Sequence, residues 1–421
     1  MSDAETGFRF RSIALPALLP SLLFAIGEGS IIPIIPAIAQ DLGAGLALAG
    51  FIAAMIMVGE LIGDIPSGWI VSRIGERRAM VGASLVSIIG VTTCIVASGP
   101  WMLGVGIFLL GLSTATFALA RHAFMTTFVP LQYRARALST LGGTFRAGWF
   151  VGPFIAAGLI ALTSHAEIVF WVHLACAVLV IVLLLMMPDP TAGAAARAQT
   201  TDGTHETEGE HLVAEESHGL FRTVWNFRGV LVRLGTGVAI VGALRASRSV
   251  ILPLWAVSLD LSESTTALII GLGGAMDFAL FYASGQVMDR FGRLWSVVPS
   301  MLGMGIGLFV LAFTHDLQHA VGWFIGVTVL TGLANGIGSG ILMTLGADLA
   351  PKDDPAPFLG AFRFTGDAGT AAAPLLVSLV VAVATLSLAT AIMGVIGVLG
   401  AGLMLRYVPR YVPRRPGRPS A

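Results

Sequence analysis

Long apolar runs separated by short polar turns make up most of the chain. A bilayer core of about 30 Å needs roughly 20 apolar residues in a helix, and twelve runs reach that length. They predict membrane-spanning helices near 13–36, 45–71, 79–98, 101–125, 137–162, 168–187, 229–257, 264–287, 295–313, 320–349, 356–380 and 384–407. The stretch between the sixth and seventh runs is polar, acidic and poor in aromatic residues, which predicts a flexible linker.

The second half of the chain repeats landmarks of the first half at a constant offset. Glu60 and Asp277 are 217 residues apart. Further pairs at this offset are Gly68 with Gly285, Arg73 with Arg290, Gly75 with Gly292, Pro36 with Pro253, Glu28 with Arg245, and Arg146 with Arg363. This spacing indicates a duplicated half. We therefore expect an all-α membrane protein with twelve transmembrane helices in two pseudo-symmetric six-helix bundles, residues 1–187 and 229–410, with a cytoplasmic linker at 188–228 and a basic cytoplasmic tail at 411–421.

Composition supports a multi-pass membrane protein. Of the 421 residues, 56% are hydrophobic and only 11% are charged, which is unlike an ordinary soluble globule. The net charge of zero argues against a generally basic nucleic-acid binder. Cys94 and Cys176 lie in apolar runs, so buried packing explains them better than a disulfide. The first apolar run carries Glu28 and has no cleavage-site pattern, so we expect the first helix to stay in the protein.

The distribution of basic residues predicts the orientation. If both termini are cytoplasmic, the basic turns and ends all lie on that side: Arg9, Arg11, Arg73, Arg77, Arg78, Arg134, Arg136, Arg222, Arg228, Arg290, Arg293, Lys352, Arg406, Arg410, Arg414, Arg415 and Arg418. The outer turns, near Asp41, Ser98, His165, Asp260, His315 and Thr385, contain no Lys or Arg. Because cytoplasmic loops carry the excess of positive charge, we expect a multi-pass protein of the cell membrane with both termini cytoplasmic.

Each half carries a Gly/Arg turn after its second helix. The second copy has Gly285, Asp289, Arg290, Gly292 and Arg293 in the spacing Gly-x-x-x-Asp-Arg-x-Gly-Arg, and the first has Gly68, Arg73, Gly75, Arg77 and Arg78, with Ser72 at the Asp position. With the twelve helices and the central linker, these loops resemble those of the major facilitator superfamily. The resemblance implies loop contacts between the halves at the cytoplasmic face, which break when the inside opens. The alternative is simple membrane anchoring by positive charge.

The fifth predicted helix carries a glycine motif. Gly148, Gly152 and Pro153 resemble part of the motif of the twelve-helix drug:proton antiporter group, whereas Ile107 stands where those exporters have an Arg in helix four. Glycine is frequent, with 52 residues. In lipid this usually indicates helices packed closely through small faces.

Ionisable side chains inside predicted spans are candidate functional residues, because a charge at membrane depth costs a few kcal/mol or more. The candidates for proton coupling are Glu28, Glu60, Asp64 and Asp277. The candidates for substrate binding are Glu28, Arg146, Arg245, Arg248, Arg363 and Asp367.

Glu28 and Arg245 hold equivalent positions, each eight residues before an equivalent proline. In the superfamily, helices one and seven border the central cavity on opposite sides. The pair can therefore form an interdomain bridge, a proton site or a clamp on substrate, or a salt bridge that only holds the halves together. Arg248 lies one turn beyond Arg245, so the two can also form a patch for an anionic group.

Glu60 and Asp64 lie one helical turn apart on one face. Two acids in apolar surroundings repel each other and burial disfavours charge, so we expect at least one to hold a proton near neutral pH. Asp64, near Pro66 and Gly68, can instead satisfy loosened backbone. Asp277 shares the repeat position of Glu60.

The remaining intramembrane charges differ in their expected partners. Arg363 and Asp367 lie at i and i+4 and can pair within helix eleven. Arg146 has no acid at the matching place and needs a partner from another helix or a substrate. Arg121, with His122 and Asp348, is expected in a charge cluster at the cytoplasmic face.

These features favour a secondary active transporter working by alternating access. The concrete hypothesis is proton-coupled efflux of small amphipathic or drug-like compounds. The alternative is proton- or ion-coupled transport of an organic anion, a carboxylate metabolite or metal chelator, bound by Arg146, Arg245 and Arg248. A third possibility is a non-transporting membrane scaffold or sensor.

Other classes lack the necessary motifs. An ATP-driven pump needs a phosphate-binding loop, and the one lysine, Lys352, has no glycine run before it. The sequence contains no metal-ligand cluster and no nucleophile elbow, so we expect no enzyme activity, no metal site and no cofactor. The expected partners are a small-molecule substrate, protons and the lipid bilayer, with no nucleic acid, and we expect a monomer.

Overall fold

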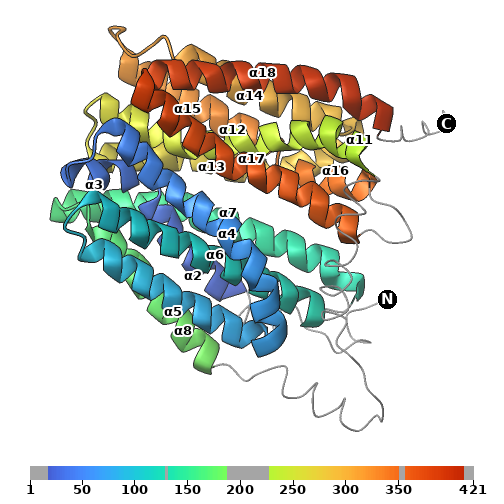
Figure 1. The fold of residues 1–421 in the computed structure, drawn as a ribbon, viewed down its shortest axis with the longest axis horizontal. Coiled ribbons are helices and arrows are strands. Elements are labelled where there is room, and N and C mark those ends of the chain that lie inside the picture. Colours follow the sequence, from blue (N-terminus) through green and yellow to red (C-terminus); the bar gives the residue numbers. More distant parts are fainter. Residues whose placement is uncertain (1–17, 129–130, 187–226, 350–355, 412–421) are drawn as a thin grey trace. The chain divides into compact units, whose positions relative to one another are not determined.

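The computed structural model describes residues 18–128, 131–186, 227–349 and 356–411, which are helical apart from short turns (Figure 1). The first half contains α2 (Leu19–Ile31), α3 (Ile35–Asp41), α4 (Leu46–Ile74), α5 (Glu76–Ile95), α6 (Pro100–Phe128), α7 (Leu131–Thr163) and α8 (Ile168–Met186). The second half contains α11 (Arg228–Val230), the π-helical turn η2 (Leu231–Gly235), α12 (Thr236–Ser258), α13 (Glu263–Phe291), α14 (Leu294–Leu311), α15 (Ala320–Ile337), α16 (Ile341–Leu349), α17 (Ala356–Val383) and α18 (Leu386–Tyr411). Nearly all of the predicted linker and tail lies outside the described residues.

The predicted number of membrane spans agrees with these helices. In the described part of the chain, eleven helices are long and apolar enough to cross a membrane, and the pair α2 and α3, bent by 45°, makes a twelfth. The bend follows from Pro33 and Pro36, because proline lacks the N–H that continues a helix. The all-helical prediction is thus confirmed. The predicted end of the first span at residue 36 is too early, since α3 continues to Asp41.

The chain divides into two compact units, Met1–Glu210 with Leu261–Gly271, and His211–Asp260 with Leu272–Ala421. Each unit repeats the same packing pattern. In the first, α2 packs on α7 and α8, and α5 packs on α6 and α8. In the second, α12 packs on α17 and α18, and α14 packs on α15 and α18. The helices in these four contacts correspond one to one, so the internal duplication extends to this part of the packing. The predicted domain boundaries stay a prediction.

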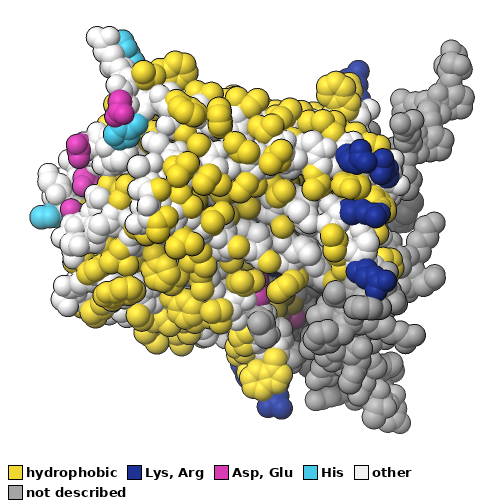
Figure 2. Space-filling model, turned by 45° about the horizontal axis from the view of Figure 1, so that its top comes forward, with side chains coloured by type: hydrophobic (Ala, Val, Ile, Leu, Met, Phe, Trp, Pro, Cys, Tyr) yellow, Lys and Arg dark blue, Asp and Glu magenta, His cyan; other side chains and the backbone are white. Residues whose placement is uncertain are grey.

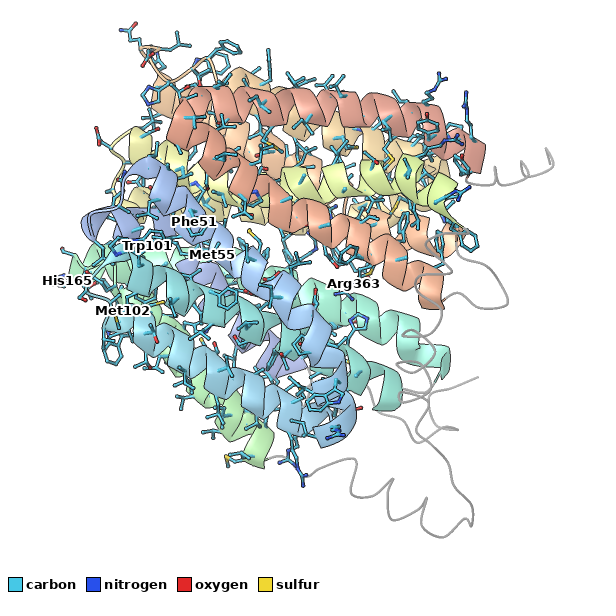
Figure 3. The ribbon with its side chains drawn as sticks, viewed as in Figure 1. Phe51, Met55, Trp101, Met102, His165 and Arg363 are labelled. Atoms are coloured by element: carbon cyan, nitrogen blue, oxygen red, sulfur yellow. The ribbon has the colours of Figure 1, made fainter. Side chains whose placement is uncertain are left out.

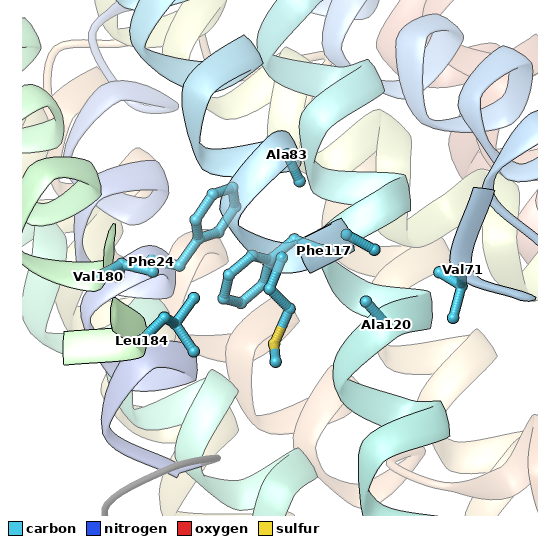
Figure 4. Packing of buried hydrophobic residues seen from close by; sticks show 9 residues of the cluster. Phe24, Val71, Ala83, Phe117, Ala120, Val180 and Leu184 are labelled. Carbon is cyan, nitrogen blue, oxygen red and sulfur yellow. The ribbon is translucent and has the colours of Figure 1, made fainter. Parts of the chain in front are cut away.

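Aromatic stacking fixes the core of the first unit. Phe24 of α2 lies flat on Phe117 of α6, with ring centroids 4.3 Å apart and planes inclined by 7°. Val180 and Leu184 of α8 pack around the two rings (Figure 4). With Val71 of α4 and Met80 of α5, this cluster joins five helices of the unit.

Hydrophobic side chains also cover much of the outer surface. The face in Figure 2 is largely hydrophobic, with few charged side chains among the apolar ones. Leu162 and Val383, for example, are 83% and 78% exposed. Phe51 of α4 and Trp101 of α6 meet edge to face, with centroids 6.3 Å apart (Figure 3). Such a surface suits contact with lipid tails, as expected of a multi-pass membrane protein.

Candidate functional site

Glu28 is the most deeply buried of the predicted site residues. It lies on α2 and is 3% exposed. The Thr114 hydroxyl of α6 donates to Oε1 at 3.0 Å, and the Trp149 indole N–H of α7 donates to Oε2 at 3.1 Å. Both carboxylate oxygens are therefore held by uncharged donors from two other helices.

The helix-five glycines bring Trp149 to this carboxylate. A Cβ at Gly148 would lie 2.5 Å from the Cβ of Ala25, and one at Gly152 would lie 2.6 Å from the carbonyl oxygen of Ile26. A Cβ at Gly29 would lie 3.0 Å from the Cα of Trp149. Side chains at these positions would push α2 and α7 apart. The small faces thus set the distance across which the indole reaches Glu28.

Arg121 of α6 completes a charged cluster in the first unit. Its guanidinium carbon lies 4.1 Å from the centre of the Phe145 ring. Its Nε and Nη1 atoms are buried and have no hydrogen-bond partner among the described residues. Glu28 and Glu60 lie close enough for their charges to act on it. We call Glu28, Thr114, Trp149, Arg121 and Glu60 the first-unit cluster.

Arg121 and Asp348 belong to different units, so the expected charge cluster of the two stays a prediction. Asp348 accepts two hydrogen bonds from Arg293, at 2.7 and 3.2 Å. Asp64 and Arg146 are half-buried in the first unit, on α4 and α7.

The second unit holds the other predicted acids and arginines in separate places. Asn335 of α15 donates through Nδ2 to Asp277 of α13 at 3.0 Å. Arg245 donates through Nη2 to the carbonyl of Gly338 at 2.7 Å. Arg248 points at α13, with Nη2 3.5 Å from the place a Cβ of Gly273 would take. Glu28 and Arg245 belong to different units, so their pairing stays a prediction.

Arg363 and Asp367 pair within α17, with Nε 3.4 Å from Oδ2. The Arg363 side chain is 64% exposed (Figure 3). An exposed i, i+4 pair contributes little to stability. A role of this pair in substrate binding stays a prediction.

The two predicted gating loops have tight glycine turns. Gly75 and Gly292 adopt φ of 81° and 98°, values that residues with a side chain rarely adopt. Arg77 donates to the carbonyls of Leu184 and Leu185, at 2.6 and 3.0 Å, and so holds the end of α8. The positions of the other predicted loop residues do not by themselves indicate a gating role. Gly68 and Gly285 lie within helices, and Arg78 and Arg290 are exposed. Arg73 stacks on Trp69. The side chains of Ser72 and Asp289 lie outside the described part.

Three uncharged partners of the acids were not predicted from the sequence. They are Thr114, Trp149 and Asn335. No pattern in the chain distinguishes them from other residues of apolar helices. Only Trp149 had a local signal, because it follows Gly148 in the helix-five motif.

Two units of repeated helix packing, with ionisable side chains inside them, are typical of membrane transporters with an internal duplication. The sequence model described as Major Facilitator Superfamily matches residues 18–374 and 234–421. The chain belongs to this superfamily. It is a secondary transporter and not an enzyme.

Individual relatives are distant and differ in the activities their names state. Tetracycline resistance protein, class C, of Escherichia coli is 24% identical over 92% of this chain and 93% of its own length. The class G protein of Vibrio anguillarum is 26% identical over 80% and 81%. The galactose-proton symporter of Escherichia coli is 22% identical over 70% and 68%. The match to Myo-inositol transporter 1 of Candida albicans, 25% identical over 36% of this chain, spans only 28% of that protein.

Solved structures share the fold. The D-xylose-proton symporter superposes with a TM-score of 0.73 at 18% identity, covering 96% of this chain and 98% of the other. A POT family transporter in complex with a thioalcohol-conjugated peptide gives 0.76 at 13% identity, covering 96% and 97%. The major facilitator fold predicted from the sequence is confirmed by these matches.

Proposed function

We propose that the protein exports small amphipathic or drug-like compounds in exchange for protons and that Glu28 carries the coupling proton. The observation that supports this most is the buried carboxylate of Glu28, held on both oxygens by neutral donors. A carboxylate at this depth that serves only structure is expected to have a fixed cationic partner in direct contact.

Neutral donors allow the carboxyl group to exchange a proton without losing its place. The Thr114 hydroxyl can rotate from donor to acceptor when Glu28 gains a proton, because a hydroxyl serves both roles. The Trp149 N–H can only donate, and so keeps one oxygen as an acceptor in either state. The geometry thus suits two protonation states of Glu28.

Arg121 connects this proton to the rest of the first-unit cluster. While Glu28 is charged, two negative charges act on Arg121, those of Glu28 and Glu60. Protonation of Glu28 removes one negative charge and leaves Arg121 under-compensated in a medium of low dielectric. A helix rearrangement that brings Arg121 a new partner then becomes favourable. This is a local electrostatic change of the kind that biases an alternating-access equilibrium.

The relatives support this proposal from two directions. Two proteins named for tetracycline resistance match most of the chain, which favours efflux of a drug-like compound. A galactose-proton symporter matches 70% of the chain, which favours protons as the coupling ion. We place the exchange at the cell membrane, with both termini cytoplasmic and the two halves of a monomer rocking about a midplane site.

Proteoliposomes test the proposal. Purified protein is reconstituted with a pH-sensitive dye inside, and cationic, neutral and anionic compounds are added in turn. We expect a compound-triggered proton flux that Glu28→Gln abolishes. Glu167→Gln is the matched control, because it makes the same change at an exposed position in the same unit. Proton flux that survives in Glu28→Gln would contradict the assignment of the proton to Glu28.

A second candidate function is transport of an organic anion. The buried Nε and Nη1 of Arg121, without hydrogen-bond partners among the described residues, favour it because their N–H groups can donate to an anionic group. Arg146 and Arg248 are the further candidate ligands. If anionic compounds move without proton flux and Arg121→Gln raises the half-saturation concentration for anions alone, this candidate replaces the first. Liposomes that move no compound under any gradient would support a scaffold or sensor.

A further inference from the structure

Helix ten of the transporter is broken in the second unit. α15 ends at Ile337 and α16 begins at Ile341, and the turn between them is Gly338, Ser339 and Gly340. Gly340 has φ of 75°. The N–H of Ile341 donates to the carbonyl of Gly338, three residues back, instead of to that of Ile337. A break at membrane depth needs other donors for its carbonyl groups, because no water replaces the lost helical bonds.

Three other helices supply these donors. Arg245 of α12 donates to the carbonyl of Gly338 at 2.7 Å. Ser296 of α14 donates to that of Ile337 at 2.6 Å, and Ser284 of α13 donates to that of Ser339. Three consecutive carbonyls are thus each held by a side chain from a different helix.

The equivalent positions in the first half of the chain carry different residues from those at the break. Arg245 is the counterpart of Glu28, and Gly338 is the counterpart of Arg121, since 338 − 121 and 245 − 28 both equal 217. In the first unit this position on helix four belongs to an unbroken helix, α6, and carries a cation near a carboxylate. In the second unit the cation has moved to the facing helix and its partner is a backbone carbonyl. Arg245 thus donates one N–H of its guanidinium, on Nη2, to the backbone of the protein itself.

We propose that Arg245 is a positioning residue, not a substrate ligand: with Ser284 and Ser296 it pins the break of helix ten and so sets the position of α16 during transport. A Cβ at Gly338 would lie at ordinary contact distance, 3.5 Å, from Nη2 of Arg245, but only 2.7 Å from the Cβ of Ser300, so close packing against α14 favours glycine at this turn. α16 is a short segment beyond a glycine hinge. Loss of the side-chain bonds at the break would free α16 to move. This changes the rate of conformational exchange without changing the contacts that hold the solute.

Hydrogen exchange of the full chain in nanodiscs tests this inference without any substrate. We expect the amides of residues 341–349 to exchange about tenfold faster in Arg245→Gln, with a smaller increase in Ser284→Ala and Ser296→Ala. Residues 320–337 should be unaffected. Arg245→Lys keeps a charged donor and should restore most of the protection. Ser378→Ala is the matched control, because its buried hydroxyl bonds only within its own helix, to the carbonyl of Pro374.

Transport kinetics distinguish positioning from ligand binding. For any compound that the liposome panel identifies, Arg245→Gln should change the turnover rate and leave the half-saturation concentration within twofold. The inference is overturned if residues 341–349 exchange as in wild type in both Arg245→Gln and Ser284→Ala, or if Arg245→Gln raises half-saturation for anionic compounds alone. If Arg245→Gln does not fold, the two serine variants carry the exchange test. Neither result depends on which acid carries the proton.

Discussion

Gly152→Ala should separate α2 from α7 and weaken both the fold and the coupling. An added Cβ at Gly152 would lie 2.6 Å from the Ile26 carbonyl oxygen, 2.7 Å from the Gly29 carbonyl carbon and 2.7 Å from the Ser30 nitrogen. All three are backbone atoms, so no side chain can turn away. Since Cβ contacts below 3.0 Å are essentially never seen, the helices must move apart by at least 0.4 Å (3.0 − 2.6).

The expected size of the effect follows from two opposing terms. Overpacking of a close interface costs about 1–3 kcal/mol. Replacing glycine by alanine inside a helix stabilises it by about 1 kcal/mol. Gly158→Ala, on the same helix with nothing within 4 Å of the added Cβ, has only the second term. We therefore expect Gly152→Ala to be less stable than Gly158→Ala by about 1–3 kcal/mol.

Unfolding of the two variants in mixed detergent micelles, followed by tryptophan fluorescence, measures this difference. Proton flux in liposomes measures its consequence, because the Trp149 indole reaches Glu28 across the same contact, at 3.1 Å. We expect reduced coupling only in Gly152→Ala. Equal stability of the two variants would refute the claim that this glycine sets the spacing of α2 and α7.

Three further predictions concern single contacts. Trp149→Phe removes one donor from Glu28 and should lower the compound-triggered proton flux at least tenfold. Trp171→Phe, which changes an exposed tryptophan of the same unit, should leave the flux unchanged. Equal flux in both variants would exclude the Trp149 indole from coupling. The half-buried pair Arg293 and Asp348 should show a coupling free energy of about 1–3 kcal/mol in a double-mutant cycle, and a value near zero would reduce it to a surface pair. Arg77→Ala should speed hydrogen exchange at the end of α8 several-fold, and unchanged exchange would show that its two bonds to that helix do not hold it.

The fold could be predicted almost completely from the sequence, because a bilayer permits few solutions. Apolar runs of about 20 residues specify spans, and the constant offset between Glu60 and Asp277 revealed the duplication. Helix ends were less predictable. α3 continues to Asp41 past a proline bend, and the break between α15 and α16 lies inside one uninterrupted apolar run. Hydrophobicity does not distinguish a broken helix from a straight one.

The site could be predicted only in part, for a different reason. Charged residues in apolar runs stand out, so Glu28 and Asp277 were visible at once. Their partners Thr114, Trp149 and Asn335 are ordinary helix residues whose roles depend on how helices rotate and approach. That rotation is set by glycine contacts between segments far apart in the sequence, and one chain alone does not show them. Arg245 was visible as a charge, but its bond to the carbonyl of Gly338 was not.

Calorimetry of compound binding tests the central claim most directly. A compound that the liposome panel identifies is titrated into purified protein in two buffers with different ionisation enthalpies, which gives the number of protons released per compound bound. The account predicts release close to one proton in wild type and in Glu167→Gln, and none in Glu28→Gln. Equal release in wild type and Glu28→Gln, with the compound still bound, would contradict the assignment of the coupling proton to Glu28.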